Sequence, residues 1–374
     1  MGLRQRIAAL ALREVRVLLV EQPGWALTRI AAERALAARG WRAARSAADA
    51  DALLCCGEPG PEFDQLVERL FAQLPRPRAW ERADHPDGVA AALDQILAAL
   101  RAGGFTAAPT KGKPARAEDA DMNHADMGGG DMSGPGGIPL AGGDQDRDGL
   151  EMDVLSVRLG PVLPAWPAGL ELSVTLAGDL ITDSHAGLVG LDAETALPLE
   201  VSRHEHAALA ADRIGWLLLL AGTGRAERQL RQVRDGLLDG AEIAWCTGQL
   251  RRLADGLARS RSLRWSLRGL GRIDQGALQE LDLPRDWSGD VLDRLHRRLS
   301  GLSELVDELT DPAVRSVLPK GPSINRAQLD LMADTVRGLD LGAARLVISS
   351  VDIDLTGGVG STQSAVTARP GGSS

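Results

Sequence analysis

Residues 13–40 read REVRVLLVEQPGWALTRIAAERALAARG, and this stretch decides the fold of the N-terminal part. Residues 13–24 predict a buried strand, because an apolar run ends there in a Pro-Gly turn. Residues 26–40 predict a helix that stops at Gly40, since glycine is the residue that most often follows a helix end. A strand followed directly by a helix is typical of an α/β domain.

The following segments repeat this alternation. Residues 50–60 (ADALLCCGEPG) predict a second strand with its own turn, and residues 85–104 predict a third helix. Between them lies an amphipathic segment whose apolar residues recur at helical spacing: Phe63, Leu66, Leu70 and Leu74. Residues 1–104 are therefore expected to form an α/β N-terminal domain with a small parallel sheet.

Composition and charge limit the class of protein. The 374 residues are 44% apolar and 25% charged, as in ordinary soluble globular chains. The net charge of -9 argues against nucleic acid as a partner, because phosphate binding needs a basic face. Three cysteines cannot form a disulfide framework, and no segment has the pattern of a signal peptide or a membrane span, so a cytoplasmic location is expected.

Two segments are too poor in large apolar residues to fold alone. Residues 105–150 consist mainly of Gly, Pro, Ala and Asp and predict a flexible linker, because they cannot bury enough surface to offset the entropy of ordering. Residues 356–374 predict a disordered tail for the same reason.

Residues 151–355 predict an α+β C-terminal domain, in which a small β-sheet precedes an antiparallel helical bundle. Residues 151–200 form the β part, with two or three strands, and residues 201–355 form the bundle, which ends in a strand at 344–355. One bundle helix is expected to start at Ser288 as its N-cap. Its apolar stripe is Leu292, Leu295, Leu299, Leu302, Leu305 and Leu309.

Three segments of the C-terminal part carry a resemblance to a known family. Residues 160–181 read GPVLPAWPAGLELSVTLAGDLI and resemble the first segment of the hydrogenase-like, quinone-site large subunit of respiratory complex I, which opens with a Gly-Pro-x-His-Pro loop. Residues 280–324 are similar to the Asp-Leu-Pro-x-Gly-Trp element of that family and the helix after it. Residues 344–355 resemble its closing strand. The three segments occur in the family's order.

The N-terminal part resembles the cluster-bearing small subunit of the same complexes and of membrane-bound nickel–iron hydrogenases. Residues 48–80 look like its strand, glycine turn, helix and proline-rich segment, and residues 85–100 look like its last helix. The stretch between Trp80 and His85 is much shorter than in that family. The chain thus resembles a fusion of the two subunits.

The loop at 160–167 departs from the family at the residues that would do chemistry. The resemblance puts Leu163 where the family has the histidine that faces the quinone, and the second histidine of the loop falls near Pro167. The chain has no tyrosine, so the family's quinone-binding tyrosine is missing. Leucine neither donates a hydrogen bond nor carries a proton. The degenerate quinone-loop residues are Gly160, Pro161, Leu163, Pro164, Trp166 and Pro167.

The cysteines do not match the metal centres of the family. An iron–sulfur cluster needs four thiolates, and the nickel–iron centre needs two cysteine pairs, but Cys246 is alone in the C-terminal part. Cys55 and Cys56 are adjacent, as in the small-subunit family, but they end the second predicted strand. The family's pair follows the first strand, where this sequence reads EQPGWALTR. We interpret both residues as buried strand residues and expect no cofactor.

The linker contains two weak metal motifs. A Met/His group could hold copper or nickel, although a plain flexible linker accounts for it as well: Met122, His124, Met127 and Met132. Three aspartates match the start of a calcium loop: Asp144, Asp146 and Asp148. The twelfth position of that loop is Leu155 instead of glutamate, so an acidic solvated turn is favoured, with Glu151 and Asp153 as possible substitutes.

Isolated histidines and tryptophans give no site. His204 and His206 are two residues apart and fall on different faces of a helix, which disfavours a shared metal. Trp216 and Trp287 are expected to be core residues.

These observations favour a non-catalytic subunit of a complex I-like or hydrogenase-like assembly. The resemblance implies membrane subunits of an antiporter-like kind as partners and a peripheral position on the cytoplasmic face of the membrane. Two alternatives stay open: a quinone-binding component of such an oxidoreductase, with quinone in an apolar pocket behind the 160–167 loop, and a metal-responsive module that acts through the linker.

Overall fold

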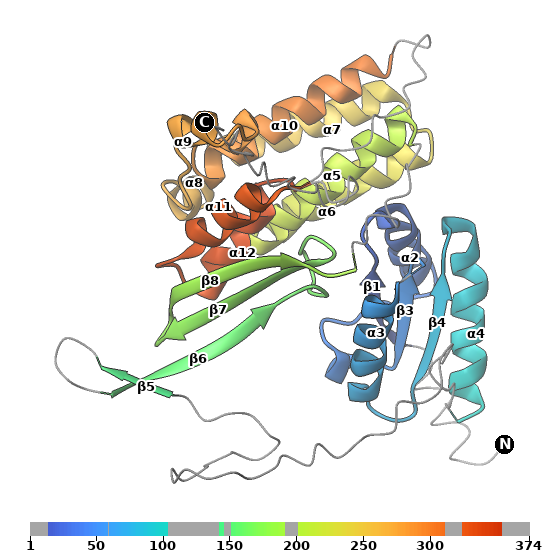
Figure 1. The fold of residues 1–374 in the computed structure, drawn as a ribbon. Coiled ribbons are helices and arrows are strands. Elements are labelled where there is room, and N and C mark those ends of the chain that lie inside the picture. Colours follow the sequence, from blue (N-terminus) through green and yellow to red (C-terminus); the bar gives the residue numbers. More distant parts are fainter. Residues whose placement is uncertain are drawn as a thin grey trace, which may run out of the picture. The chain divides into compact units, whose positions relative to one another are not determined.

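A computed structural model describes residues 14–58, 60–103, 142–145, 151–190, 201–310 and 324–353 (Figure 1). The chain divides into two compact units. One contains residues 1–164, 173–184 and 337–341, and the other contains residues 165–172, 185–336 and 342–374. Apart from residues 142–145, the predicted linker at 105–150 lies outside the described residues, as does the predicted tail at 356–374.

The N-terminal part is an α/β structure with a parallel sheet, as the sequence predicts. Its elements are β1 (Arg16–Glu21), α2 (Ala26–Ala38), β2 (Arg42–Ala43), β3 (Ala52–Cys56), α3 (Pro61–Gln73), β4 (Ala79–Ala83) and α4 (Val89–Arg101). The strand order is β2-β1-β3-β4, and every neighbouring pair is parallel. The all-apolar, fully buried β3 lies in the interior of the sheet, which is where parallel strands place continuous apolar runs.

The core of this part lies between the sheet and the helices. Side chains of β1 and β3 such as Val17, Leu54 and Cys56 pack with residues of α2 and α4, including Leu36 and Ile96. The register pairs β1 with β3 and β3 with β4 so that the three strands end at one edge. This edge positions the first candidate site.

Two strands of this sheet were not predicted from the sequence. Strand β2 has two residues, too few for a periodic signal. Strand β4 reads AWERA and follows a proline-rich stretch, which reads as a loop. Its buried ends, Ala79, Trp80 and Ala83, belong to a strand that is held by pairing with β3.

A second sheet of order β5-β6-β7-β8 follows. It consists of β5 (Gly142–Gln145), β6 (Glu151–Leu159), β7 (Leu170–Ala177) and β8 (Leu180–Leu188). Strand β7 alternates buried and half-buried residues, and Gly178 takes a φ of 59° in the tight turn to β8. Strand β5 pairs antiparallel with β6, so residues 142–145 are not part of a structureless linker. The sequence does not predict this strand, because glycine, present at positions 142 and 143, has a low strand propensity.

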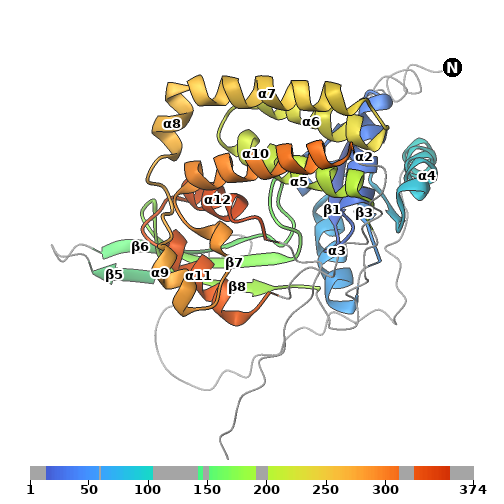
Figure 2. The ribbon, with the colours of Figure 1, turned by 90° about the horizontal axis from the view of Figure 1, so that it is seen from above.

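Helices make up most of the remaining described residues: α5 (Arg203–Leu220), α6 (Gly224–Leu238), α7 (Ile243–Arg259), α8 (Arg261–Leu267), α9 (Gln275–Glu280), α10 (Val291–Glu308), α11 (Arg326–Val336) and α12 (Leu341–Ser350). Contacts join α5 to α6, α6 to α7, α7 to α10 and α10 back to α5, so these four long helices form a closed bundle (Figure 2). The predicted helical bundle after a small sheet is thus present.

The leucine stripe of α10 is confirmed in part, and its start is wrong. Leu295, Leu299 and Leu302 are buried, whereas Leu292, Leu305 and Leu309 are only half-buried. The N-cap is Asp290 rather than Ser288, since Asp290 forms a reciprocal capping box with Asp293. The stretch around Ser288 is instead a short 3-10 turn over residues 285–287 and its end.

The predicted closing strand at 344–355 is wrong, because residues 341–350 form helix α12. The β-branched run LVISSV has high strand propensity. Its buried residues nevertheless recur at helical spacing, at Ala344, Val347, Ile348 and Val351. Burial of this stripe outweighs the local propensity.

No helix in the described part of the chain combines the length and apolar character needed to cross a bilayer.

Candidate functional site

The carboxyl edge of the parallel sheet is the first candidate site. The connection from β1 runs to β2 on one side, and β3 lies on the other side, so the strand order reverses between β1 and β3. Ligands of open α/β sheets bind in the crevice at this point. Here the edge is built from Gln22 and Trp25 after β1, Gly57 after β3 and Asp84 after β4.

Trp25 fills this edge. A Cβ on Gly57 would lie 2.6 Å from Gln22 Cβ and 2.8 Å from two ring atoms of Trp25, so the indole lies directly against the Gly57 backbone. The indole Nε1–H donates to the carbonyl of Asp84 at 3.0 Å. Gln22 is fully buried beside it, and its backbone N–H donates to Cys56 O at 2.9 Å. One side chain therefore touches the ends of three strands.

The arginine next to this edge is paired within the chain. Arg29, on α2, is only 6% exposed. Its guanidinium pairs with Glu21 at the end of β1 and, at 2.6 Å, with Glu33 on the next turn of α2. Arg29 is thus held between two carboxylates and fixes the start of α2 against β1.

The adjacent cysteines do not fit an iron–sulfur cluster. Cys55 and Cys56 are fully buried, and successive residues of a strand point to opposite faces of the sheet. Burial raises the pKa of Cys55 to about 12, against a smaller opposing effect of Arg82, and burial raises the pKa of Cys56 well above its ordinary value. Cys246 is buried on α7, and burial raises its pKa as well. Cluster ligands must be thiolates, so these residues fit the interpretation as core residues.

The loop at 160–167 is the second candidate site, and Trp166 anchors it. Trp166 is 3% exposed, and its Nε1–H donates to Leu170 O at 2.7 Å. The Leu170 amide donates back to Pro167 O at 3.2 Å, which closes a compact turn before β7. Leu163 is half-buried and Pro164 is exposed. Gly160 precedes a cis peptide bond to Pro161, and the latter is buried.

Sequence reasoning missed a charged network at the end of α12. A single carboxylate oxygen of Asp352 accepts from Arg213 Nε at 2.6 Å and from Arg298 Nη2 at 3.1 Å. Arg298 also donates to Ser349 O at 2.7 Å. Asp352 has a φ of 54°, the left-handed region. Burial raises the pKa of Asp352, but Arg213 and Arg298 outweigh it and hold that pKa at about 2.

Arg294 extends this network into the bundle. It is 1% exposed and donates from Nε to Ser350 Oγ at 2.8 Å. Its other nitrogens donate to the carbonyls of Trp287, Gly289 and Gly271 at 2.7–3.1 Å. Burial lowers its pKa to about 10, so it stays charged at neutral pH. The only sequence signal was its position, three residues after buried Val291 on the inner face of α10.

This network joins the segment after α12 to helices α5 and α10, and its aspartate is not suited to donate a proton. An aspartate with a pKa of about 2 is ionised at neutral pH and cannot donate a proton. The arginines are bonded to carboxylate and carbonyl oxygens of α12 and of the turn before α10. Its role is structural, because its ion pairs and hydrogen bonds hold these elements together; we call the pairing of Arg213 and Arg298 with Asp352 the clamp.

Most of the predicted metal-binding residues lie in the part of the chain that the structure does not describe. Met122, His124, Met127, Met132, Asp146 and Asp148 lie outside the described residues, and Asp144 belongs to β5. Within the described ranges, no group of three or more His, Cys, Asp or Glu side chains could hold a metal. Trp287 is buried, as predicted, and Trp216 is half-buried.

Comparisons with known proteins assign no family to the chain. No protein-family model matches it, and no curated protein sequence matches it. Function is therefore inferred from the geometry of the sheet edge and of the 160–167 loop, together with the resemblance of their motifs.

Proposed function

We propose that this chain is a non-catalytic structural or assembly subunit of a membrane-associated complex of the complex I-like or hydrogenase-related type. It combines a small-subunit-like part and a large-subunit-like part in one polypeptide. Its partners are membrane subunits of an antiporter-like kind, and it sits peripherally on the cytoplasmic face. It retains the scaffold of such subunits and has replaced their reactive groups.

The packing of Trp25 is the observation that carries this proposal. The resemblance places the small subunit's cysteine pair directly after the first strand, and here that stretch contains Trp25. Its ring lies against Gly57, and its N–H is bonded to Asp84 O. A cluster at this edge would need both thiolates and space, and the side chains present supply a tryptophan instead.

The second loop supports the same proposal. The resemblance assigns quinone contact to the positions around Leu163, whose side chain has no hydrogen-bonding group. Trp166 could donate a hydrogen bond, but its N–H is used on Leu170 O within the turn. The loop keeps its role in leading the chain into β7.

The proposal is tested by isolating the chain from its own cells. A tagged chromosomal copy is extracted from membranes in mild detergent, separated on a native gel and analysed by mass spectrometry. We expect it in a large complex with integral membrane proteins, and we expect that complex to disappear when the gene is deleted. Recovery of the chain as a free monomer, with the membrane proteins still assembled in the deletion strain, would refute the proposal.

A matched measurement separates the quinone-binding alternative. Electron transfer to a soluble quinone analogue is measured on complexes that contain Leu163→Ala or, as a control at an exposed position, Leu155→Ala. A structural loop predicts equal rates in both complexes. Loss of quinone-dependent electron transfer in Leu163→Ala alone, with assembly intact, would favour a working quinone site.

A further inference from the structure

Helix α8 presents a basic outer face that contains a tryptophan. Its inner face is apolar and buried, through Leu263 and Leu267. Residues three, four and seven positions apart share one face of a helix. On this face lie Arg261, Arg264 and Trp265, and Arg268 follows directly as the C-cap residue; all four are exposed. We call these four residues the α8 outer face.

Trp265 is 87% exposed, far more than any other large apolar side chain in the described residues, of which the next is Leu180 at 51%. Leaving an indole in water forgoes the burial that its large apolar surface would gain. Tryptophan is one of the side chains enriched where a protein meets a partner or a membrane headgroup layer. The exposure of Trp265 therefore points to an interaction surface.

The sequence that flanks Trp265 carries charge of one sign, and the carboxylate bonded to it, that of Asp290, is buried and accepts from the Gly269 N–H at 2.7 Å. Residues 256–273 contain five arginines and no acidic residue, in a chain of net charge -9. None of these five arginines takes part in an ion pair with any residue that the structure describes, and Arg264 donates to Ala258 O at 2.6 Å. The nearest acidic residue that follows, Asp274, caps α9 through the Gly276 amide.

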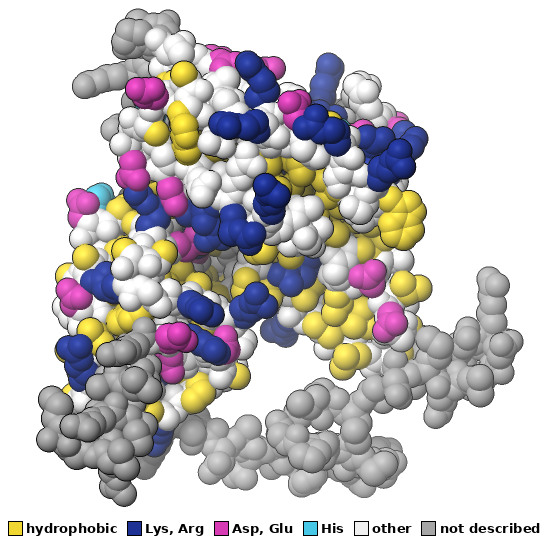
Figure 3. Space-filling model, turned by 180° about the vertical axis from the view of Figure 1, so that it is seen from behind, with side chains coloured by type: hydrophobic (Ala, Val, Ile, Leu, Met, Phe, Trp, Pro, Cys, Tyr) yellow, Lys and Arg dark blue, Asp and Glu magenta, His cyan; other side chains and the backbone are white. Residues whose placement is uncertain are grey.

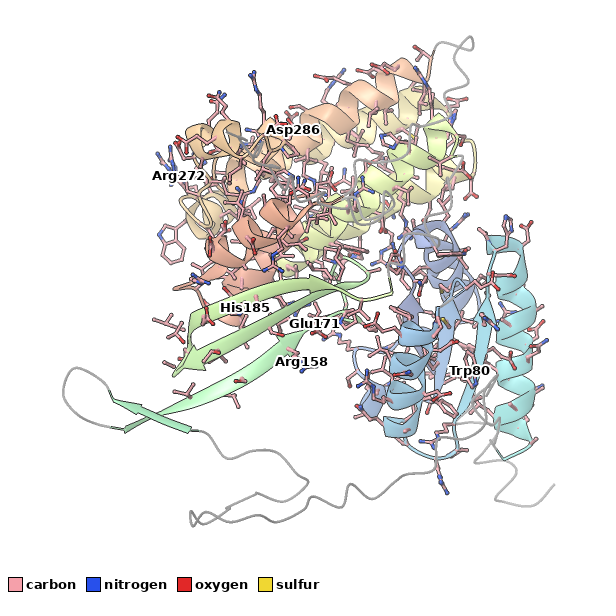
Figure 4. The ribbon with its side chains drawn as sticks, in the orientation of Figure 1. Trp80, Arg158, Glu171, His185, Arg272 and Asp286 are labelled. Carbon is pink, nitrogen blue, oxygen red and sulfur yellow. The ribbon has the colours of Figure 1, made fainter. Side chains whose placement is uncertain are left out.

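The figures agree with an outward-facing basic surface. Arg272, which follows α8, points away from the helices in Figure 4. In Figure 3, Lys and Arg side chains gather at the upper right, where a half turn from Figure 1 brings the α8 region, and hydrophobic side chains are exposed beside them.

We propose that the α8 outer face binds an anionic phospholipid surface directly. Arginine pairs with phosphate through two parallel hydrogen bonds, and the amphipathic indole is most stable at the headgroup level. Nucleic acid offers the same phosphates, but the net charge of -9 repels a long polyanion, whereas a membrane contacts only the face turned toward it. This inference does not depend on the proposed membrane subunits as partners.

The test is flotation of the full chain with lipid vesicles. One set is pure phosphatidylcholine, and the other contains about a third phosphatidylglycerol, to supply the negative surface. We expect binding to the second set only. Arg261→Gln with Arg264→Gln should lower the partition coefficient by about 25-fold, since each basic residue at such a surface contributes on the order of fivefold. Raising the salt to about 0.5 M should weaken wild-type binding.

Control variants remove the same groups elsewhere. Arg225→Gln with Arg228→Gln removes two exposed arginines from α6 and should bind as wild type does. Trp265→Ala should reduce binding at low and at high salt, because the indole contributes an apolar term that salt does not screen. All altered side chains are exposed, so unchanged thermal unfolding is the check on folding.

Two results would overturn the inference. One is equal loss of binding in the α6 and α8 variants, which would make the attraction a matter of total charge. The other is a wild-type chain that does not bind anionic vesicles; if it then binds a single-stranded oligonucleotide through Arg261 and Arg264, the surface is one for nucleic acid.

Discussion

Trp25 and Gly57 show how one side chain can occupy the sheet edge at which open α/β sheets bind their ligands. Gly57 has a φ of 123°, and a Cβ there would meet both Gln22 and Trp25 at less than 3 Å. Glycine is required both for the backbone conformation and for the space taken by the indole. The packing of Trp25 therefore requires glycine at position 57, directly after β3.

Gly57→Ala tests this packing at the residue scale. We expect it to destabilise the chain more than Gly24→Ala does, by roughly 1–3 kcal/mol, because only Gly57 adds a steric clash to the cost of positive φ. Gly24 has a φ of 93° and nothing within 4 Å of a Cβ. Urea unfolding of the two variants gives the difference, and equal free energies of unfolding would mean that Trp25 is not packed against Gly57.

Trp166→Ala tests the anchor of the 160–167 loop. We expect a loss of about 3–5 kcal/mol in the free energy of unfolding, since a buried indole and its hydrogen bond to Leu170 O are removed. Trp265→Ala serves as the control, because that ring is 87% exposed and its loss should cost no more than about 0.5 kcal/mol. Similar stabilities for the two variants would contradict the loop structure.

At the scale of elements, the clamp of Arg213 and Arg298 on Asp352 makes stability depend on acid pH. The pKa of Asp352 is lowered to about 2 in the folded chain, below its value of about 3.9 when unfolded. The stabilisation is therefore complete above about pH 4 and is lost as the pH falls through about 2. A third of the side chain is exposed, so solvent screening limits it to roughly 1 kcal/mol.

Asp352→Asn measures this contribution. The variant should be less stable than wild type at pH 6, and the difference should shrink as the pH approaches 2. Asp330→Asn breaks an exposed pair with Arg326 and should have little effect at either pH. A difference for Asp352→Asn that does not change with pH would show that the carboxylate is not held by the two arginines.

The elements differ in how far the sequence could predict them. The bundle helices and the β1–α2 unit have long periodic patterns, which determine element type. Strand β4 has no such pattern, because its structure depends on pairing with β3. Helix α12 has none either, because burial of Ala344 and Val347 determines its structure. Serine and aspartate are both common N-cap residues, so the sequence does not distinguish Ser288 from Asp290. The capping box that selects Asp290 depends on side-chain geometry.

At the scale of the whole molecule, the sequence predicts which residue types the candidate sites contain, but not which of these residues come into contact. The lack of tyrosine and the placement of Cys55 and Cys56 are visible in the sequence. The closure by Trp25 is not, because it joins residues 22, 25, 57 and 84, which only the parallel register brings to one edge. Buried Arg294 was missed for a similar reason, since its partners lie up to 56 residues away.

Trp25 occupies the sheet edge at which the proposed function would otherwise require a redox centre. The most direct test is iron and sulfide analysis of the full chain, purified without air and incubated with iron and sulfide, together with paramagnetic resonance after reduction. We predict a colourless protein with iron well below one atom per chain and no signal, because Cys55 and Cys56 are buried as thiols on opposite sheet faces and Cys246 is buried on α7. A brown protein with about four iron atoms per chain and a reducible signal would contradict the account.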